Sequence, residues 1–98
     1  MRSFTKAADD VLLERARQIK DEGFTDVSDD KYTYGELARA AACYCLSASG
    51  CAERPFWPWP AEWFKPRTPR EDLVKAGALI LAEIERLDRI ERKTSKAF

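Results

Sequence analysis

The sequence predicts a small all-α domain, and two observations support that fold class. Apolar residues recur at intervals of three and four along three segments, which is typical of amphipathic helices. The second and third segments each open with Thr-x-x-Glu, the capping box of a helix N-terminus. A chain of 98 residues has room for one hydrophobic core. We therefore expect a single domain over residues 1–98, with three helices and one long loop.

The first helix is predicted over about residues 5–21. Its apolar stripe consists of Ala8, Val11, Leu12, Ala16 and Ile19. Gly23 then provides a C-terminal stop, because glycine adopts the left-handed conformation that ends many helices. The connection that follows is rich in aspartate and has few apolar residues.

The second helix is predicted over about residues 33–48. Thr33 and Glu36 form its capping box, and Gly50 ends the segment. Four alanines lie close together near its middle, at positions 38, 40, 41 and 42. Because alanine has a small side chain, we expect a neighbouring backbone to approach this helix closely.

Residues 51–68 are predicted to form an irregular segment, which we call the aromatic loop. The stretch from residue 51 to the start of the next helix holds all five prolines and all three tryptophans of the chain: Pro55, Pro58, Pro60, Pro66 and Pro69 with Trp57, Trp59 and Trp63. Proline at this density forbids a continuous helix. Loops of this length are more often functional than shorter connections. The aromatic loop is either a lid on the core or a platform for stacking a ligand, and both alternatives stay open.

The third helix is predicted over about residues 69–92. Thr68, Pro69 and Glu71 give it an N-cap, a proline at the first helical position and a capping glutamate. About 24 residues at 1.5 Å each reach ~36 Å, whereas a domain of this size has a radius of gyration of only ~13 Å. The helix should therefore overhang its own domain, and we predict a homo-oligomer.

Composition excludes several function classes. Lys plus Arg and Asp plus Glu both total 17, so the formal net charge is zero, and we expect no nucleic-acid or membrane partner. The chain has no histidine, so it offers no catalytic triad and no histidine-based zinc site. The three cysteines lack a Cys-x-x-Cys spacing. We therefore predict no metal and no cofactor, and a cytoplasmic protein with reduced thiols.

The candidate site residues are polar or aromatic side chains placed near the predicted helix ends. If the starts of the second and third helices lie beside each other, their N–H groups and several cations face a common mouth that suits an anion. The predicted ligand-binding residues are Arg17, Gln18, Asp29, Asp30, Tyr32, Glu36, Trp63, Lys65, Arg67, Arg70 and Lys75. We expect the cations and Gln18 to engage phosphates or ribose, the aromatics to stack on a base, and the carboxylates to accept from ribose or base.

Several segments in a fixed order resemble a family of small, mostly unnamed proteins of tailed phages and prophages. The segments are ERARQ (14–18), EG (22–23), DDKYTYGELARAAACY (29–44), WPWPAEWFKP (57–66) and DLVKAGALILAEIERLDR (72–89). They span about residues 14–89. The opening segment ERARQ and the ending AEIERLDR are also loosely similar to small phage proteins that are grouped near the MazG pyrophosphohydrolases. The MazG enzymes hold magnesium with ExxE and ExxD motifs. Glu85-x-x-Asp88 matches ExxD, but no ExxE occurs in the chain.

The resemblance implies a phage protein, and small phage proteins include counter-defence proteins that sequester immune signals. We therefore predict a non-enzymatic protein that binds and sequesters a small phosphorylated nucleotide-like ligand, such as a cyclic ADP-ribose-type or cyclic nucleotide signal, to inhibit bacterial anti-phage defence. One alternative is a MazG-like, magnesium-dependent nucleotide pyrophosphohydrolase. Another is a protein-binding inhibitor of a host factor.

Overall fold

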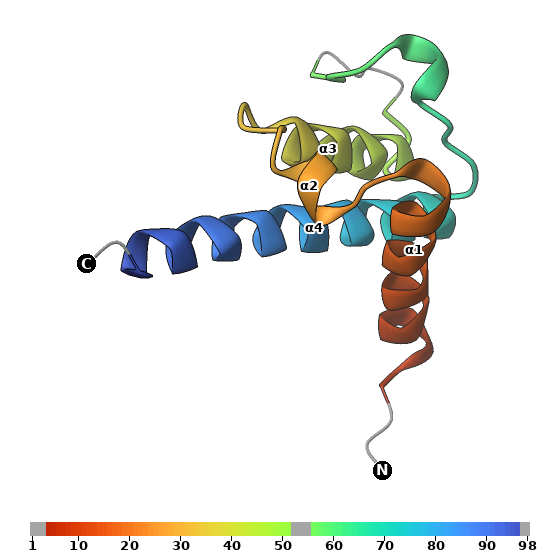
Figure 1. Ribbon diagram of the computed structural model, residues 1–98. Helices are drawn as coiled ribbons and strands as arrows, with labels where there is room; N and C mark the ends of the chain where they lie inside the picture. The colour runs from red at the N-terminus through yellow and green to blue at the C-terminus, as the bar shows by residue number, and fades with distance from the viewer. Residues whose placement is uncertain (1–3, 52–55, 97–98) are drawn as a thin grey trace.

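The computed structural model describes residues 4–51 and 56–96, and within these ranges it is all-α with no strand (Figure 1). The elements in chain order are α1 (Lys6–Glu22), α2 (Asp26–Asp29), α3 (Glu36–Ala48), the short 3₁₀ helix η1 (Ala61–Trp63) and α4 (Pro69–Lys96). The predicted fold class is therefore confirmed. None of the described helices is both long and apolar enough to span a membrane.

The first helix lies close to its predicted bounds. The Thr5 hydroxyl accepts a hydrogen bond from the Ala8 N–H at 3.1 Å and caps the N-terminus of α1. Gly23 ends the helix in the left-handed conformation, at φ 74°. The short helix α2 was not predicted, because a segment of four residues is too short to show a helical period.

The predicted start of the second helix is wrong by three residues. Gly35, at φ 78°, is the residue before α3, and no side chain caps this N-terminus. The Glu36 carboxylate instead accepts from the Tyr34 N–H at 2.7 Å. Thr33 and Glu36 therefore do not form a capping box, because the left-handed turn at Gly35 separates Thr33 from the helix.

The predicted start of the last helix is correct. The Thr68 hydroxyl accepts from the Glu71 N–H at 3.1 Å and lies 3.1 Å from the Glu71 carboxylate. The helix continues to Lys96, beyond its predicted end. Its 28 residues correspond to ~42 Å, and Figure 1 shows its C-terminal half projecting past α2 and α3.

The core lies between α3 and α4, which run antiparallel (Figure 1). Ser47, near the end of α3, donates to Asp72, near the start of α4, at 3.3 Å. The buried core residues are Leu37, Ala40, Ala41, Tyr44, Ala76, Leu79 and Ala82. The antiparallel arrangement puts the N-termini of α3 and α4 at opposite ends of the pair. The prediction that these two helix starts form a common mouth is therefore wrong.

Residues 56–68 of the aromatic loop pack onto this core. Three rings of the loop are partly buried against the core, those of Trp57, Trp59 and Phe64. Phe24 and Tyr32, from before α3, pack there as well. The Trp57 indole N–H donates to the Pro60 carbonyl at 3.0 Å, which fixes one turn of the loop. Residues 52–55, including the predicted loop residue Pro55, lie outside the described residues.

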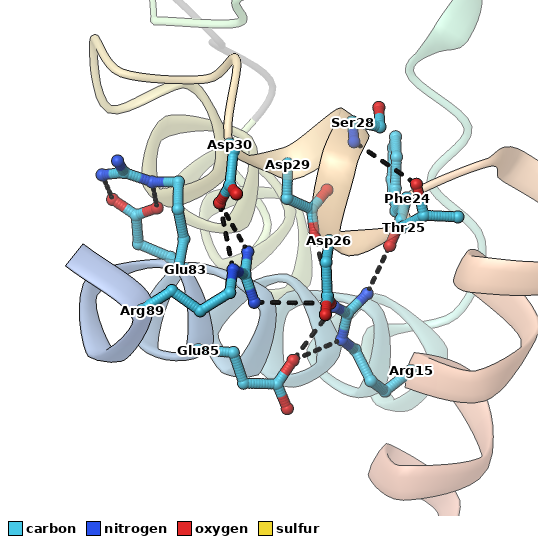
Figure 2. A network of polar contacts seen from close by, with 11 residues as sticks. Arg15, Phe24, Thr25, Asp26, Ser28, Asp29, Asp30, Glu83, Glu85 and Arg89 are labelled. Atoms are coloured by element: carbon cyan, nitrogen blue, oxygen red, sulfur yellow. Dashed lines mark hydrogen bonds and ion pairs between the residues drawn. The ribbon is translucent and has the colours of Figure 1, made fainter. Parts of the chain in front are cut away.

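A network of ion pairs joins α1, α2 and α4 (Figure 2). The buried Arg15 guanidinium donates to the Glu85 carboxylate at 3.0 and 3.1 Å, to the Asp29 carboxylate at 3.1 Å and to the Phe24 carbonyl at 3.0 Å. Beside it, Arg89 of α4 donates to Asp30 at 2.8 and 3.0 Å. Burial raises the pKa of Asp29, and the positive charge of Arg15 offsets part of this effect.

Replacing Arg15 should destabilise the fold strongly. In Arg15→Met the Asp29 carboxylate would stay fully buried without its cation, and such a loss costs about 3 kcal/mol or more. Urea unfolding followed by circular dichroism measures the difference in the free energy of unfolding. Lys20→Met is the matched control, because Lys20 is exposed on the same helix. A stability of Arg15→Met within about 0.5 kcal/mol of the control, the range of ordinary surface substitutions, would contradict this role.

Candidate functional site

A hollow of about 340 Å³ lies where the end of α1, the aromatic loop and the α3–α4 pair meet, and we call it the aromatic pocket. Its aromatic lining residues are Phe24, Tyr44, Trp57, Trp59 and Trp63. Its charged lining residues are Glu14, Arg17, Asp21, Glu22, Lys65 and Lys75. Gln18 and Leu79 complete the lining.

The lining residues differ in burial, and this difference separates a floor from a rim. Gln18, Tyr44 and Leu79 are buried and form the floor. Trp63 is 54% exposed and lies at the rim. The pocket thus leads from an exposed indole down to a buried amide and a buried phenol.

One wall of the pocket is a chain of ring contacts. The Trp57 and Trp59 rings meet edge to face with their centroids 5.5 Å apart. The ring of Trp59 also contacts Phe24 at 5.6 Å and Trp63 at 6.4 Å. Aromatic pairs at these distances are stabilising beyond the area they bury. Trp57 and Trp59 are therefore held by neighbours, whereas Trp63 ends the chain of rings.

Arg17 is held by carboxylates of its own helix. Its Nε and Nη2 atoms donate to the two oxygens of Glu14 at 2.8 and 2.7 Å, and Glu22 lies 3.4 Å away. Burial alone would raise the pKa of Glu14, but the hydrogen bonds and charge of Arg17 outweigh it, so the pKa lies below its usual value. The same pairing raises the pKa of Arg17. This guanidinium is therefore already paired when the pocket is empty.

The two lysines of the pocket differ in whether they already have a partner. The Lys75 ammonium donates to the Lys65 carbonyl at 2.7 Å and lies 5.4 Å from the centroid of the Tyr44 ring. The side chains of Lys65 and Asp21 make no hydrogen bond or ion pair with the described residues. They are the two charged groups of the lining that remain open to a ligand.

A second hollow, of about 300 Å³, adjoins the aromatic pocket. The two hollows share Glu14, Arg17 and Lys75 as lining residues. Arg70 lines the second hollow, and its guanidinium pairs with the Asp10 carboxylate at 2.9 Å.

The structure brings together five of the eleven predicted site residues: Arg17, Gln18, Trp63, Lys65 and Lys75. Arg70 lies in the adjoining hollow. The remaining five do not line the aromatic pocket: Asp29, Asp30, Tyr32, Glu36 and Arg67. For these five, the prediction of one common mouth is wrong.

The five residues outside the pocket have structural contacts instead. Asp29 and Asp30 belong to the ion-pair network with Arg15 and Arg89 (Figure 2). Tyr32 packs edge to face against the outside of the wall, on the ring of Trp59 at 5.4 Å. The other two lie at helix ends: Glu36 at the start of α3, and Arg67 exposed beside Glu71 at 3.4 Å before α4.

Sequence reasoning missed eight lining residues: Glu14, Asp21, Glu22, Phe24, Tyr44, Trp57, Trp59 and Leu79. A local signal for Phe24 exists: the left-handed Gly23 turns the chain back, so that an apolar residue directly after it points toward the core. Asp21 and Glu22 gave no such signal, because acidic residues near a helix end are normally read as solvated.

Glu85 and Asp88, the ExxD match, lie apart from the aromatic pocket. They line a hollow of about 530 Å³ together with Asp26 and Arg89. Glu85 is engaged by Arg15. Across the described parts of the chain, no group of three or more histidine, cysteine or acidic side chains is placed to hold a metal ion.

The stability of the protein should depend on pH through Glu14. A carboxyl group whose pKa is lowered in the folded state contributes stability above its usual pKa of 4.5, and this contribution is lost as pH falls through the lowered value. The free energy of unfolding should therefore fall less between pH 5 and pH 3 in Glu14→Gln than in the wild type. Glu91→Gln, an exposed position on α4, is the control. Equal acid dependence in Glu14→Gln and the wild type would contradict the pairing with Arg17.

The chain matches no protein-family model, no curated protein and no solved structure. The resemblance to small phage proteins therefore stays a prediction.

Proposed function

We propose that the protein binds a small planar ligand of the nucleobase or nucleoside class in the aromatic pocket and releases it unchanged. The observation that carries this proposal is a hollow walled by tryptophans with one indole half exposed at its rim. A volume of about 340 Å³ is at the lower end of the range for small-molecule sites, ~300–1,000 Å³. It suits a base with its sugar better than a dinucleotide.

Trp63 is the residue proposed to stack on the ligand. Its ring ends the aromatic chain and is 54% exposed, so a second planar ring can cover it. Stacking of a base on an aromatic side chain is worth about 1–3 kcal/mol. Trp59, behind it, supports the indole from within the wall.

The charges of the lining favour a ligand with at most one anionic group. Three carboxylates and three cations line the pocket, so their formal charges cancel. Arg17 and Lys75 already have partners, which leaves Lys65 to meet an anion. The phosphorylated ligand predicted from the sequence is therefore narrowed to a nucleoside or a ligand with a single phosphate.

The proposed role is binding rather than catalysis. No serine, threonine, cysteine or histidine is among the lining residues that the structure describes, so the lining offers none of these four nucleophiles. Sequestration of a nucleotide-derived immune signal in a phage setting is a prediction in keeping with this role. The MazG-like hydrolase and the inhibitor of a host protein stay as the alternatives.

Replacing Trp63 should weaken ligand binding selectively. In Trp63→Ala, the affinity for nucleosides measured by isothermal titration calorimetry should fall about tenfold or more, since stacking is lost. Phe56→Ala is the matched control, because Phe56 is a similarly exposed ring of the same loop outside the pocket lining. Nucleoside triphosphates should bind more weakly than nucleosides. Equal affinity of Trp63→Ala and Phe56→Ala, or the absence of a binding heat with every nucleoside, would overturn the proposal. Release of pyrophosphate from a nucleoside triphosphate would favour the hydrolase.

We also propose that the protein self-associates through α4. Leu73, Ile80, Ile84 and Leu87 are each about half exposed and recur at intervals of seven, four and three, the spacing of a coiled-coil seam. Gly77 lies on the same face, and there α1 crosses the helix with Val11 against it. The face is therefore covered at one point and open on both sides of it.

Ile84→Glu tests this second proposal. A carboxylate at the centre of the apolar face should convert a dimer to a monomer, as seen by sedimentation velocity at tens of micromolar protein. Arg92→Glu, an exposed change elsewhere on α4, should leave the sedimentation coefficient as in the wild type. A wild type that sediments as a monomer would refute self-association through this face.

A further inference from the structure

Among the described lining residues of the aromatic pocket, Gln18 is the only one with a side-chain amide. It is 3% exposed, and its Nε2 donates to the Glu14 carboxylate at 3.2 Å. Its Oε1 is buried and has no hydrogen-bond partner among residues 4–51 and 56–96. A buried acceptor without a partner costs free energy, which a donor entering the pocket would recover.

The orientation of this amide is set by its neighbours. Glu14 accepts two hydrogen bonds from the Arg17 guanidinium, so it is held as a carboxylate. An ionised carboxylate can only accept hydrogen bonds. Gln18 must therefore turn its NH₂ group toward Glu14, and its buried oxygen is left without a partner among the described residues.

The floor offers a second polar group beside this one. The Tyr44 hydroxyl accepts from the Lys65 backbone N–H at 3.1 Å. A phenol that accepts one hydrogen bond still has its own proton to donate. The buried part of the lining thus holds an acceptor without a partner on Gln18 and a hydroxyl proton on Tyr44 that can be donated.

From this arrangement we infer that the aromatic pocket selects a base with an exocyclic amine, whose N–H donates to Gln18 Oε1. The inference rests on the proposed binding of a nucleobase or nucleoside. The edge of an adenine carries an amine next to a ring nitrogen, a donor beside an acceptor, which complements the floor. Hypoxanthine has a carbonyl in place of that amine, and its oxygen would face the oxygen of Gln18. Arg17 and Glu14 are positioning residues in this selection, since they act through Gln18.

Adenosine and inosine are the probes that test the inference, because they differ in that one group. We expect the wild type to bind adenosine about tenfold or more tightly than inosine by calorimetry, the effect of facing a buried acceptor with another acceptor. Comparable affinities for both nucleosides would overturn the inference and leave the proposed function standing. Failure of both nucleosides to bind would overturn the two together.

Two variants test the positioning role of Glu14. In Glu14→Gln the new amide can donate to Gln18 as well as accept, so Gln18 is free to flip. We expect the preference for adenosine to fall to roughly threefold or less, while adenosine binding itself persists. Asp9→Asn removes an exposed carboxylate of the same helix that lies outside the pocket lining, and it should keep the wild-type preference. A preference unchanged in Glu14→Gln, or lost equally in both variants, would refute the role of the Arg17–Glu14 pair.

Discussion

The close packing of α3 against α4 is the constraint on which the rest of the structure depends. Ala40 and Ala41 on one helix and Ala76 and Ala82 on the other are at most 2% exposed. Small side chains let the two backbones approach, but they leave little apolar volume to stabilise an 11.2 kDa domain. The rings of the aromatic loop supply the missing volume, since most of them pack against this helix pair. Residues 56–68 of the aromatic loop therefore form a cover on the core.

This packing gives the aromatic loop one of the two roles that the sequence left open, a cover on the core, and leaves one ring available for the proposed second role. Its inner rings cover the core, and Trp57 is fixed further by the hydrogen bond to Pro60. Its outer ring, Trp63, stays half exposed beside a hollow. Because the inner rings pack against the core, the wall behind Trp63 is already in place in the ligand-free protein. A preformed wall lowers the cost of ordering on binding.

The parts of the fold that local patterns control could be predicted, and the parts that depend on long-range pairing could not. Gly23 and Thr68 act within one helical turn, and the end of α1 and the start of α4 followed from them. The start of α3 did not, because the left-handed turn at Gly35 is a conformation that glycine permits without requiring.

The candidate site shows the same division. Arg17, Gln18, Trp63, Lys65 and Lys75 were identified by residue type and do line one pocket. Their partners were not foreseen: the sequence does not show that Glu14 neutralises Arg17, so the pocket has balanced charge in place of the predicted positive one. The central claim, a fixed wall with Trp63 facing the ligand, is tested most directly by the three indole N–H signals in a ¹⁵N correlation spectrum. On titration with adenosine the Trp63 signal should shift most, and the signal of Trp57, whose indole N–H is held by the Pro60 carbonyl, should shift less. Three signals that do not respond, or that shift alike, would contradict it.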